Sequence, residues 1–400
     1  MLKNSLRNHD TPKFKQALTA VLERSHAADF VGYGKFDALN SPILKTFSLD
    51  NKWLRLIASQ AVKLSPVNIR PFLAVKQYKN PKGMALFARA YLNQYLLTGK
   101  ESDANLGKYC LDWLAENASP GFSGACWGYL WDWQDLGFYA PFGSPNCVVT
   151  TFVGQALLDG YERLGSEQYL ELARSSVDFI LNDLKVLYED EEMKCLSYVP
   201  DVSIQMVVMD VSALAGAFIA RVVAHTGEAH LMDEAQALLN YVVNKQTDYG
   251  AWFYTHPAGD SPVKHDNYHT GFILNTLLVY EKASNDVRFR DAYRRGLDFY
   301  ADQLFMPDGA PKWMSDKQYP YDIHGAATGI GTFARAARFE DPKWLMQAEK
   351  LAHWAIDRMQ KPDGNFRYQR GRFMTKHFTL MRWCNAWTSF GLSELLLAYD

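Results

Sequence analysis

The sequence predicts an all-α (α/α)6 toroid, a ring of six helical hairpins with inner and outer helices. Three observations favour it. Related segments such as RLGSEQYLELA, HTGEAHLMDEA and FEDPKWLMQAEK recur about every 55 to 65 residues, which suits one helical hairpin plus a connecting loop. Apolar residues on both sides of each turn follow helical periodicity. Helical stretches at the two ends of the chain have no sequence neighbour to pair with, so together they can close the ring.

Five hairpins are expected along the chain. Their ranges are 82–98 with 103–117, 148–164 with 167–183, 209–226 with 229–245, 267–284 with 288–304, and 322–338 with 342–360. One helix at 380–398 is left over, and N-terminal helices at 12–26 and 52–64 are expected to complete a sixth pair with it. Small residues, as in SALAGAFIA and GAATGIGTFARAA, let helices crowd around an axis, so the first helix of each pair is assigned to the inner ring. A tetratricopeptide solenoid is disfavoured because its period is about 34 residues.

Composition narrows the class of protein. No Ser-, Gly- or Pro-rich linker divides the 400 residues, so a single domain over 1–400 is expected. The balance of 42 Lys and Arg against 44 Asp and Glu gives no basic surplus, which argues against a nucleic-acid partner. No stretch approaches the roughly 20 apolar residues of a membrane span, and MLKNSLRNHDTPKFKQ lacks the apolar run of a secretory signal. We therefore expect a cytoplasmic protein.

The cysteines and the short motifs point to no cofactor. The five cysteines show no CxxC spacing and no Cys/His pattern of a metal site, which favours free thiols. Strings typical of phosphate-binding loops, zinc proteases and serine hydrolases are absent. No metal and no cofactor are predicted, and nothing in the sequence indicates the oligomeric state.

The links between hairpins are long and aromatic, and in a toroid they gather at the end opposite the tight turns. Function is expected at that end. Flat amphipathic rings suit the apolar faces of sugars, so the ligand is predicted to be a sugar, oligosaccharide or polysaccharide. The predicted binding residues are Trp127, Tyr129, Trp131, Trp133, Trp252, Tyr254, Trp313 and Trp383. The alternative is that these rings plug the mouth of the barrel or staple the loops together.

The sharpest local signal is a recurring Asp and His before two inner helices. Asp266 precedes His269 in HDNYHTG, and Asp322 precedes His324 in YDIHGAA. Each Asp is a good helix N-cap, which is the structural alternative to a catalytic role. Inner-helix N-termini point into the pocket, however, where their dipoles perturb nearby pKa values, so a cap can also be a catalytic group.

Three reactions and one non-catalytic role stay open. A carboxylate pair, drawn from Asp132, Asp135, Asp266 and Asp322, suits glycoside cleavage, which we place slightly ahead. Asp266 and Asp322 are the pair expected to act as acid and base, with His269 and His324 as their partners or as alternative bases. His269 and His324 suit epimerisation or isomerisation as acid and base beside a carbonyl. A His or Tyr base, with Arg382 neutralising a uronate carboxylate, suits elimination. A glycan-binding scaffold without turnover is the competing class.

A local basic patch precedes and enters the last inner helix. Arg382 lies near the start of this helix, and His377 stands just before it. Lys376 and arginines 367, 370 and 372 lie in the preceding loop. We expect Arg382 and His377 to bind an acidic group of the substrate. The alternative for the loop residues is an ordinary solvated surface.

A set of strings then indicates a family. NPKGMALFARAYL, WGYLWDWQ, VVTTFVGQALLDGYE, HTGFILNTL, YPYDIHGAA and MRWCNAWTSFGLSELLLA together resemble the VpsJ-like bacterial polysaccharide biosynthesis proteins, which belong among the six-hairpin glycosidase-like toroids. The resemblance runs from about residue 30 to the C-terminus. It implies an (α/α)6 fold and a role in making or trimming an exopolysaccharide, a capsule or a lipopolysaccharide glycan. It transfers no catalytic residue.

Overall fold

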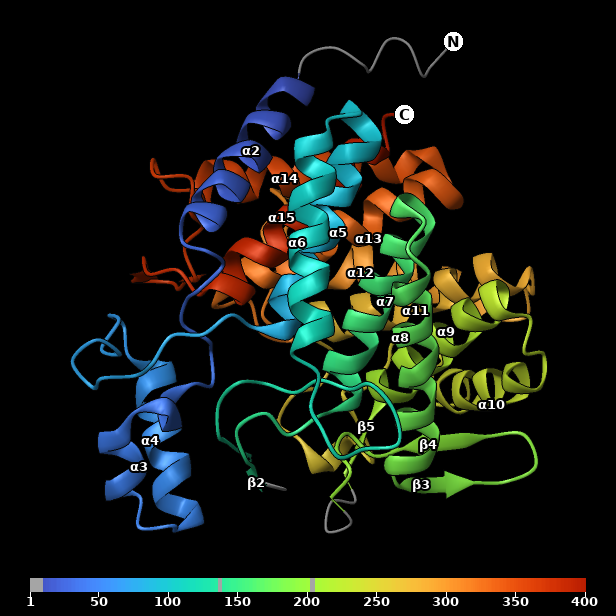
Figure 1. Ribbon diagram of the computed structural model, residues 1–400. Helices are drawn as coiled ribbons and strands as arrows, with labels where there is room; N and C mark the ends of the chain where they lie inside the picture. Colours follow the sequence, from blue (N-terminus) through green and yellow to red (C-terminus); the bar gives the residue numbers. More distant parts are fainter. Residues whose placement is uncertain (1–9, 136–138, 202–205) are drawn as a thin grey trace.

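The computed structural model describes residues 10–135, 139–201 and 206–400, and it is a toroid of paired helices (Figure 1). Five hairpins follow the predicted ranges closely. They are α5 (Pro81–Thr98) with α6 (Glu101–Glu116), α7 (Cys147–Leu164) with α8 (Glu167–Asp178), α9 (Met209–Thr226) with α10 (His230–Asn244), α11 (Asn267–Ser284) with α12 (Arg290–Gln303), and α13 (Ile323–Phe339) with α14 (Leu345–Met359). A π-helical turn, η2 (Phe179–Asp183), extends α8, and a 3-10 turn, η4 (Pro342–Trp344), precedes α14. The predicted fold class is confirmed.

The first helix of each hairpin lies in the inner ring, as predicted. Each inner helix contacts the next one around the ring, in the order α5, α7, α9, α11, α13 and α15 (Trp387–Leu397), and α15 contacts α5. A π-helical segment, η5 (Met381–Ala386), leads into α15. The close packing depends on small residues. A Cβ on Gly391 would lie 2.4 Å from the carbonyl oxygen of Ala327, so only glycine lets α15 approach α13 this closely.

The sixth hairpin differs from the prediction in one part. Helix α2 (Thr11–Ala27) packs against α15 and completes the outer ring. The helix predicted at 52–64, α4 (Lys52–Leu64), packs instead against α3 (Pro42–Phe47), η1 (Ala38–Asn40) and the short strand β1 (Trp133–Gln134). Figure 1 shows α3 and α4 standing beside the ring, at the end where the strands lie. Residues 28–80 therefore form an arm between the outermost helix and the first inner helix.

The two ends of the ring differ because the links differ. Inner helices end in left-handed C-caps at Gly99, Gly165, Gly227 and Asn285, which make the turns to the outer helices tight. Their first turns lie at the other end, where the side chains of Asn80, Asn146, Asp266 and Asp322 accept hydrogen bonds from backbone N–H groups. The long links gather around these N-termini.

Short strands stiffen the long links, a feature that the all-α prediction omitted. The antiparallel pairs are β1 (Trp133–Gln134) with β2 (Tyr139–Ala140), β3 (Val186–Glu189) with β4 (Lys194–Leu196), and β5 (Val207–Val208) with β6 (Thr255–His256). Strands β7 (Tyr321–Asp322), β8 (Gln369–Arg370) and β9 (Thr375–Lys376) form an antiparallel sheet in that order. Two links contain residues outside the described part, 136–138 and 202–205.

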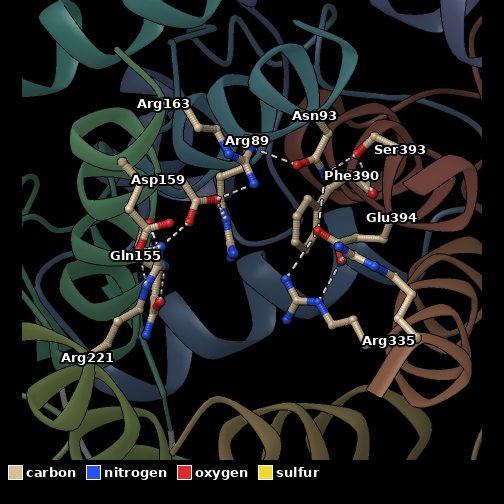
Figure 2. A network of polar contacts seen from close by, with 12 residues as sticks. Arg89, Asn93, Gln155, Asp159, Arg163, Arg221, Arg335, Phe390, Ser393 and Glu394 are labelled. Carbon is tan, nitrogen blue, oxygen red and sulfur yellow. Dashed lines mark hydrogen bonds and ion pairs between the residues drawn. The ribbon is translucent and has the colours of Figure 1, made fainter. Parts of the chain in front are cut away.

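Buried ion pairs hold the tight-turn end together (Figure 2). On one side of the ring, Asp159 of α7 binds Arg89 of α5 at 2.7 Å and Arg221 of α9 at 2.6 Å. On the other side, Glu394 of α15 binds Arg335 of α13 at 2.8 Å. Arg221 and Arg335 lie toward the C-terminal ends of α9 and α13, where helix dipoles favour positive charge. The ion pairs link adjacent inner helices: α5 with α7, α7 with α9, and α13 with α15.

All five cysteines are buried and have free thiols. No helix in the described ranges is long and apolar enough to cross a membrane.

Candidate functional site

The site begins with one position that recurs in every inner helix. The second residue of each helix or helical segment is Lys82 in α5, Val148 in α7, Asp210 in α9, Tyr268 in α11, His324 in α13 and Arg382 in η5. Five of these six side chains are polar or aromatic, although all six are largely or fully out of solvent. Lys82 interacts electrostatically with Arg382 and Asp210, and the ring of Tyr268 contacts that of His324. The six N-termini thus surround one polar centre at the end where the long links gather.

An aromatic floor closes this centre from below. The rings of Phe152, Phe272 and Trp387 contact one another at centroid distances of 5.2 to 5.4 Å. The ammonium of Lys82 lies on this floor, 3.8 Å from the Phe152 centroid and 4.7 Å from the Phe272 centroid. Below it, a cavity of about 50 Å³ extends to Arg89 and Arg335 at the tight-turn end. The floor therefore separates the polar centre from the ion-pair network.

His269 and Asp266 form an imidazole–carboxylate pair. Nδ1 of His269 lies 2.7 Å from Oδ2 of Asp266, and the His269 backbone N–H donates to Oδ1 at 2.9 Å. An ionised carboxylate only accepts, so it fixes the imidazole proton on Nδ1 and leaves Nε2 as the basic nitrogen. The pair lines a narrow recess with Asp210 and Tyr254. The Tyr254 ring lies 4.3 Å from the imidazole.

His324 is a second imidazole in the same layer. It is buried, its ring stacks on Trp383 at 4.3 Å, and the edge of Tyr268 approaches it at 4.6 Å. Burial, with the positive charges of Lys82 and Arg382 nearby, lowers the pKa of His324 well below its usual value, so the ring is neutral near pH 7. Among the described residues, no group bonds its Nδ1. Since both imidazoles contact the Tyr268 ring, at 4.3 and 4.6 Å, their centres lie within about 9 Å of each other.

Asp322 has a different environment from the one expected of a general acid. Oδ1 accepts from the backbone N–H of His324 at 3.0 Å and from Nε1 of Trp383 at 2.8 Å, and Oδ2 accepts from Gln369 at 2.8 Å. Burial raises the pKa of Asp322, while Lys35 and these donors oppose the rise. Three donors occupy its oxygens, so its role here is to cap α13 and to hold the indole of Trp383 against His324.

Asp210 was missed by the sequence analysis. It is buried, and its Oδ1 has no hydrogen-bond partner in the described part of the chain. Burial raises the pKa of Asp210, and the positive charges of His269 and Lys82 partly oppose this. The signal that could have found it is its place as second residue of an inner helix, the same place as His324 and Arg382.

Lys82 and Arg382 bring two basic side chains into the centre. Neither side chain has a carboxylate within ion-pair distance among the described residues, and Nε of Arg382 is buried without a partner there. The Arg382 guanidinium lies 5.1 Å from the Tyr129 ring, which stacks on Trp131 at 4.7 Å. Burial lowers the pKa of Lys82 well below its ordinary value, and Arg382 adds to this. The dipoles of six helix N-termini reinforce the attraction for an anion.

A third cation enters the centre from the arm. Nζ of Lys35 lies 3.6 Å from the Trp383 centroid and 5.5 Å from that of Trp313. The loop that carries it is clamped by a buried ion pair, because Arg70 binds the Asp37 carboxylate at 2.7 Å and donates to the Gly34 carbonyl at 2.9 Å. No local sequence signal marks this residue, since its position depends on contacts between distant segments.

The structure separates the remaining predicted residues into two groups. Trp133 and Tyr254 join Tyr129, Trp131, Trp313 and Trp383 around the polar centre. Trp127 does not, and its assignment to a sugar platform is corrected. Trp252 lines the recess of Asp210 and His269, but at 2% exposure it offers almost no free ring face to a ligand. Both are buried, and their indole N–H groups donate to the carbonyls of Leu114 in α6 and Val242 in α10. They anchor links to outer helices, which is the stapling alternative.

Two further predicted residues have structural partners. Asp132 accepts from Lys45 of the arm at 2.6 Å and from the Phe142 backbone at 3.0 Å, so this carboxylate joins the arm to a link. His377 is exposed and bonds Arg367 at 3.1 Å. The described residues contain no group of three or more His, Cys, Asp or Glu arranged to hold a metal ion.

Comparison with solved structures supports the architecture. The chain is similar to a sugar epimerase from a ruminal bacterium, with 14% identity, a TM-score of 0.61, and coverage of 80% of this chain and 87% of that chain. It is also similar to a GH76 alpha-mannanase from Bacteroides thetaiotaomicron, with 14% identity, a TM-score of 0.58 and coverage of 79% and 85%. An unsaturated glucuronyl hydrolase specific for heparin shares 12% identity at a TM-score of 0.60, with coverage of 98% and 97%.

At these identities the likeness shows the fold alone, that of an (α/α)6 toroid. No protein-family model matches the chain, and no curated protein does. The resemblance to VpsJ-like proteins therefore stays a prediction.

Proposed function

We propose that this chain is a carbohydrate-active enzyme that moves a proton at the carbon beside a sugar carbonyl, as epimerases and isomerases do. The observation that carries the proposal is the pair of imidazoles on neighbouring inner helices, His269 and His324, which both contact the Tyr268 ring. A carbon held between two such groups can lose a proton to one and gain a proton from the other. This scheme stood second to glycoside cleavage in the sequence analysis.

The geometry favours proton transfer over cleavage by the expected carboxylate pair. One oxygen of Asp266 caps α11 and the other bonds the His269 ring. The two oxygens of Asp322 accept hydrogen bonds from three donors. Neither carboxylate is placed to give a proton to a leaving oxygen. Elimination by a tyrosine base is also disfavoured, because burial and the nearby Asp266 and Asp322 raise the pKa of Tyr268 well above its usual value.

The reaction balances within the residues of the site. One imidazole takes the proton from the carbon beside the carbonyl, and the electron pair moves into an enediolate whose oxygen becomes negative. Lys82 and Arg382 stabilise this charge on the dry aromatic floor. The second imidazole, which enters this step as imidazolium, then returns a proton to the opposite face of the same carbon in an epimerase. In an isomerase it protonates the former carbonyl carbon, and the proton of the neighbouring hydroxyl moves to the former carbonyl oxygen. The two imidazoles end the step with their protonation states exchanged. Asp266 keeps His269 in the tautomer that this exchange needs.

The substrate is proposed to be an acidic sugar or an oligosaccharide with an acidic group. Lys35, Lys82 and Arg382 face one centre that also receives the positive ends of six helices, so an anionic group there has several partners. Stacked Tyr129 and Trp131 offer a flat wall for a sugar ring. A role in a bacterial surface-polysaccharide pathway and a cytoplasmic location belong to the same proposal, and they rest on the family resemblance and on the sequence respectively.

The solved structures of similar fold include the sugar epimerase, a D-mannose isomerase and two cellobiose 2-epimerases, which supports proton transfer at the level of fold only. Glycoside hydrolysis is the second candidate, and one observation favours it. Asp210 is a buried carboxyl with a raised pKa and an unbonded oxygen beside His269, which suits a general acid.

The test is a panel of acidic and neutral sugars and oligosaccharides, incubated with the protein in deuterated water and followed by proton NMR and mass spectrometry. Deuterium at one sugar carbon without cleavage supports proton transfer. Gain of one water with cleavage supports hydrolysis through Asp210, and a new unsaturated-uronate signal supports elimination. Binding without any product would support the scaffold alternative.

A further inference from the structure

A single surface outside the ring concentrates exposed apolar side chains. Half of the exposed large apolar side chains in the described residues lie in two segments, 42–76 of the arm and 366–376 around the β8–β9 turn, which we call the arm surface. Phe47 is 74% exposed, Trp53 63%, Phe72 84% and Phe373 91%. Monomeric proteins rarely leave apolar groups clustered in this way without a partner.

The two segments adjoin one another. Nζ of Lys376 in β9 donates to the carbonyl of Lys63 in the last turn of α4, at 2.7 Å. The turn that carries Phe373 therefore starts beside the C-terminal end of α4. The arm surface is one continuous region built from parts of the chain more than 300 residues apart.

Helix α4 has apolar residues on two faces, and the arm covers only one. Leu56, Ser59 and Val62 are buried against the arm. Trp53, Ile57 and Leu64 stand at positions i, i+4 and i+11, which share the other face, and all are exposed. The folded chain therefore leaves an ordered apolar stripe uncovered.

The same surface is strongly basic. Residues 42–76 and 366–376 contain ten Lys and Arg, all but the buried Arg70 at least partly exposed, and a single acidic residue, Asp50, in a chain whose formal net charge is −2. Carboxylates within ion-pair distance are found for Lys45, Arg55 and Arg70, whereas the described residues give none for Lys52, Arg370 or Arg372. This combination of protruding Trp, Phe and Leu with Lys and Arg is typical of helices that lie in a membrane interface.

We propose that the arm surface docks the protein on an anionic lipid bilayer, with the α4 stripe inserted at the level of the headgroups. Charge complementarity selects this occupant. A second copy would set two basic surfaces against each other, which is unfavourable. The apolar side chains protrude rather than line a pocket. Lysine is also depleted at protein–protein interfaces, which disfavours a protein partner for this surface.

The docking surface lies beside the candidate site. Lys63 of α4 lies 5.4 Å from the ring of Phe36, which neighbours the Lys35 that reaches Trp383. A docked arm would hold the polar centre close to the lipid surface.

The test is co-sedimentation of the full chain with phosphatidylcholine vesicles that contain or lack phosphatidylglycerol, at low and high salt. The expected result is binding that is about tenfold or more stronger to the anionic vesicles and that weakens with salt. The variant Trp53→Ser/Ile57→Ser/Leu64→Ser is expected to lose at least about tenfold in binding. The matched control is Leu96→Ser/Val287→Ser/Met346→Ser, which removes three exposed apolar residues outside the arm surface and is expected to bind like the parent protein.

Three results would overturn the proposal: no binding to either vesicle, equal binding to both, or an oligomer in sedimentation velocity that only the first triple variant dissociates. The last result would assign the stripe to a second copy. Vesicle binding does not require turnover, so this proposal and the proposed reaction can fail independently.

Discussion

Asp266 holds His269 twice, through the backbone N–H at 2.9 Å and through the ring Nδ1 at 2.7 Å. The first contact caps α11, and the second fixes the tautomer of the imidazole. One carboxylate thus caps a helix and orients a histidine. The two jobs are separable, because an amide can cap a helix but cannot orient the ring in the same way.

Asp266→Asn is expected to keep the fold and lose the reaction. The Asn oxygen can still accept from the backbone N–H, so the free energy of unfolding should fall by no more than about 1 kcal/mol. Its amide donates to Nδ1, which reverses the tautomer, and turnover should fall by about 10² to 10⁴. Denaturant unfolding and the deuterium-exchange assay measure the two effects. The control, Asp341→Asn at the cap of η4, makes the same change outside the ring and should leave turnover intact.

Lys82→Met is expected to stabilise the protein while abolishing activity. Methionine has a similar length, and it would replace a buried cation on the aromatic floor, 3.8 Å from the Phe152 centroid, with an apolar group. The expected gain is about 1 to 3 kcal/mol in urea unfolding. Lys79→Met, at a lysine paired with Asp29, is the control and should change stability by less than about 1 kcal/mol. A marked loss of stability in Lys82→Met would show that the ammonium has a structural partner.

Lys35 predicts a pH dependence of stability. Burial lowers the pKa of Lys35 to about 7, whereas the unfolded chain keeps an ordinary value near 10.5. Between these values the unfolded state binds more protons, so this residue makes stability rise with pH across that window, and its full cost applies below about pH 7. The advantage of Lys35→Met over the parent should therefore shrink with rising pH, by at most about 1.4 kcal/mol per pH unit. Urea unfolding from pH 6 to pH 10 measures it, and exposed Lys76→Met should show no such trend.

Glu394→Gln tests the network of Figure 2. Burial alone would raise the pKa of Glu394, but Arg335 and Arg89 outweigh it and hold the pKa at about 2. Its contribution is therefore complete above the unfolded pKa of about 4.5 and is lost as pH falls toward 2. At pH 7 the variant should lose about 3 to 5 kcal/mol, because buried guanidinium groups remain without their carboxylate. The gap should narrow below pH 4.5, and Glu340→Gln, which breaks a pair with exposed Arg294, should cost less than about 1 kcal/mol.

Local signals were enough for most of the fold. The turns at Gly165, Gly227 and Asn285 and the caps at Asp266 and Asp322 are encoded within a few residues, so the hairpins and the inner ring followed from the sequence. The place of α4 did not, because an amphipathic helix can cover any apolar surface and its periodicity does not say which one.

The site was only partly predictable for the same physical reason. His269, His324 and Arg382 stand beside caps and aromatic residues that marked them. Lys82 and Asp210 lie in helical sequences without a distinctive motif. Only their shared position as second residue of an inner helix connects them. Trp127 and Trp252 could not be told from binding residues by sequence, because a ring that staples a loop and a ring that faces a ligand occupy equivalent places in a link.

The most direct test of the account is solvent deuterium exchange by His269→Asn and His324→Asn on the sugar that the parent protein converts. If two imidazoles act on one carbon, neither single variant should interconvert the two sugars. Each variant keeps one imidazole, so it should still exchange the proton of the sugar that this imidazole deprotonates. The sugar that exchanges should therefore differ between the two variants. If either variant still interconverts the two sugars, or if both exchange the same sugar equally well, the two-histidine account is contradicted.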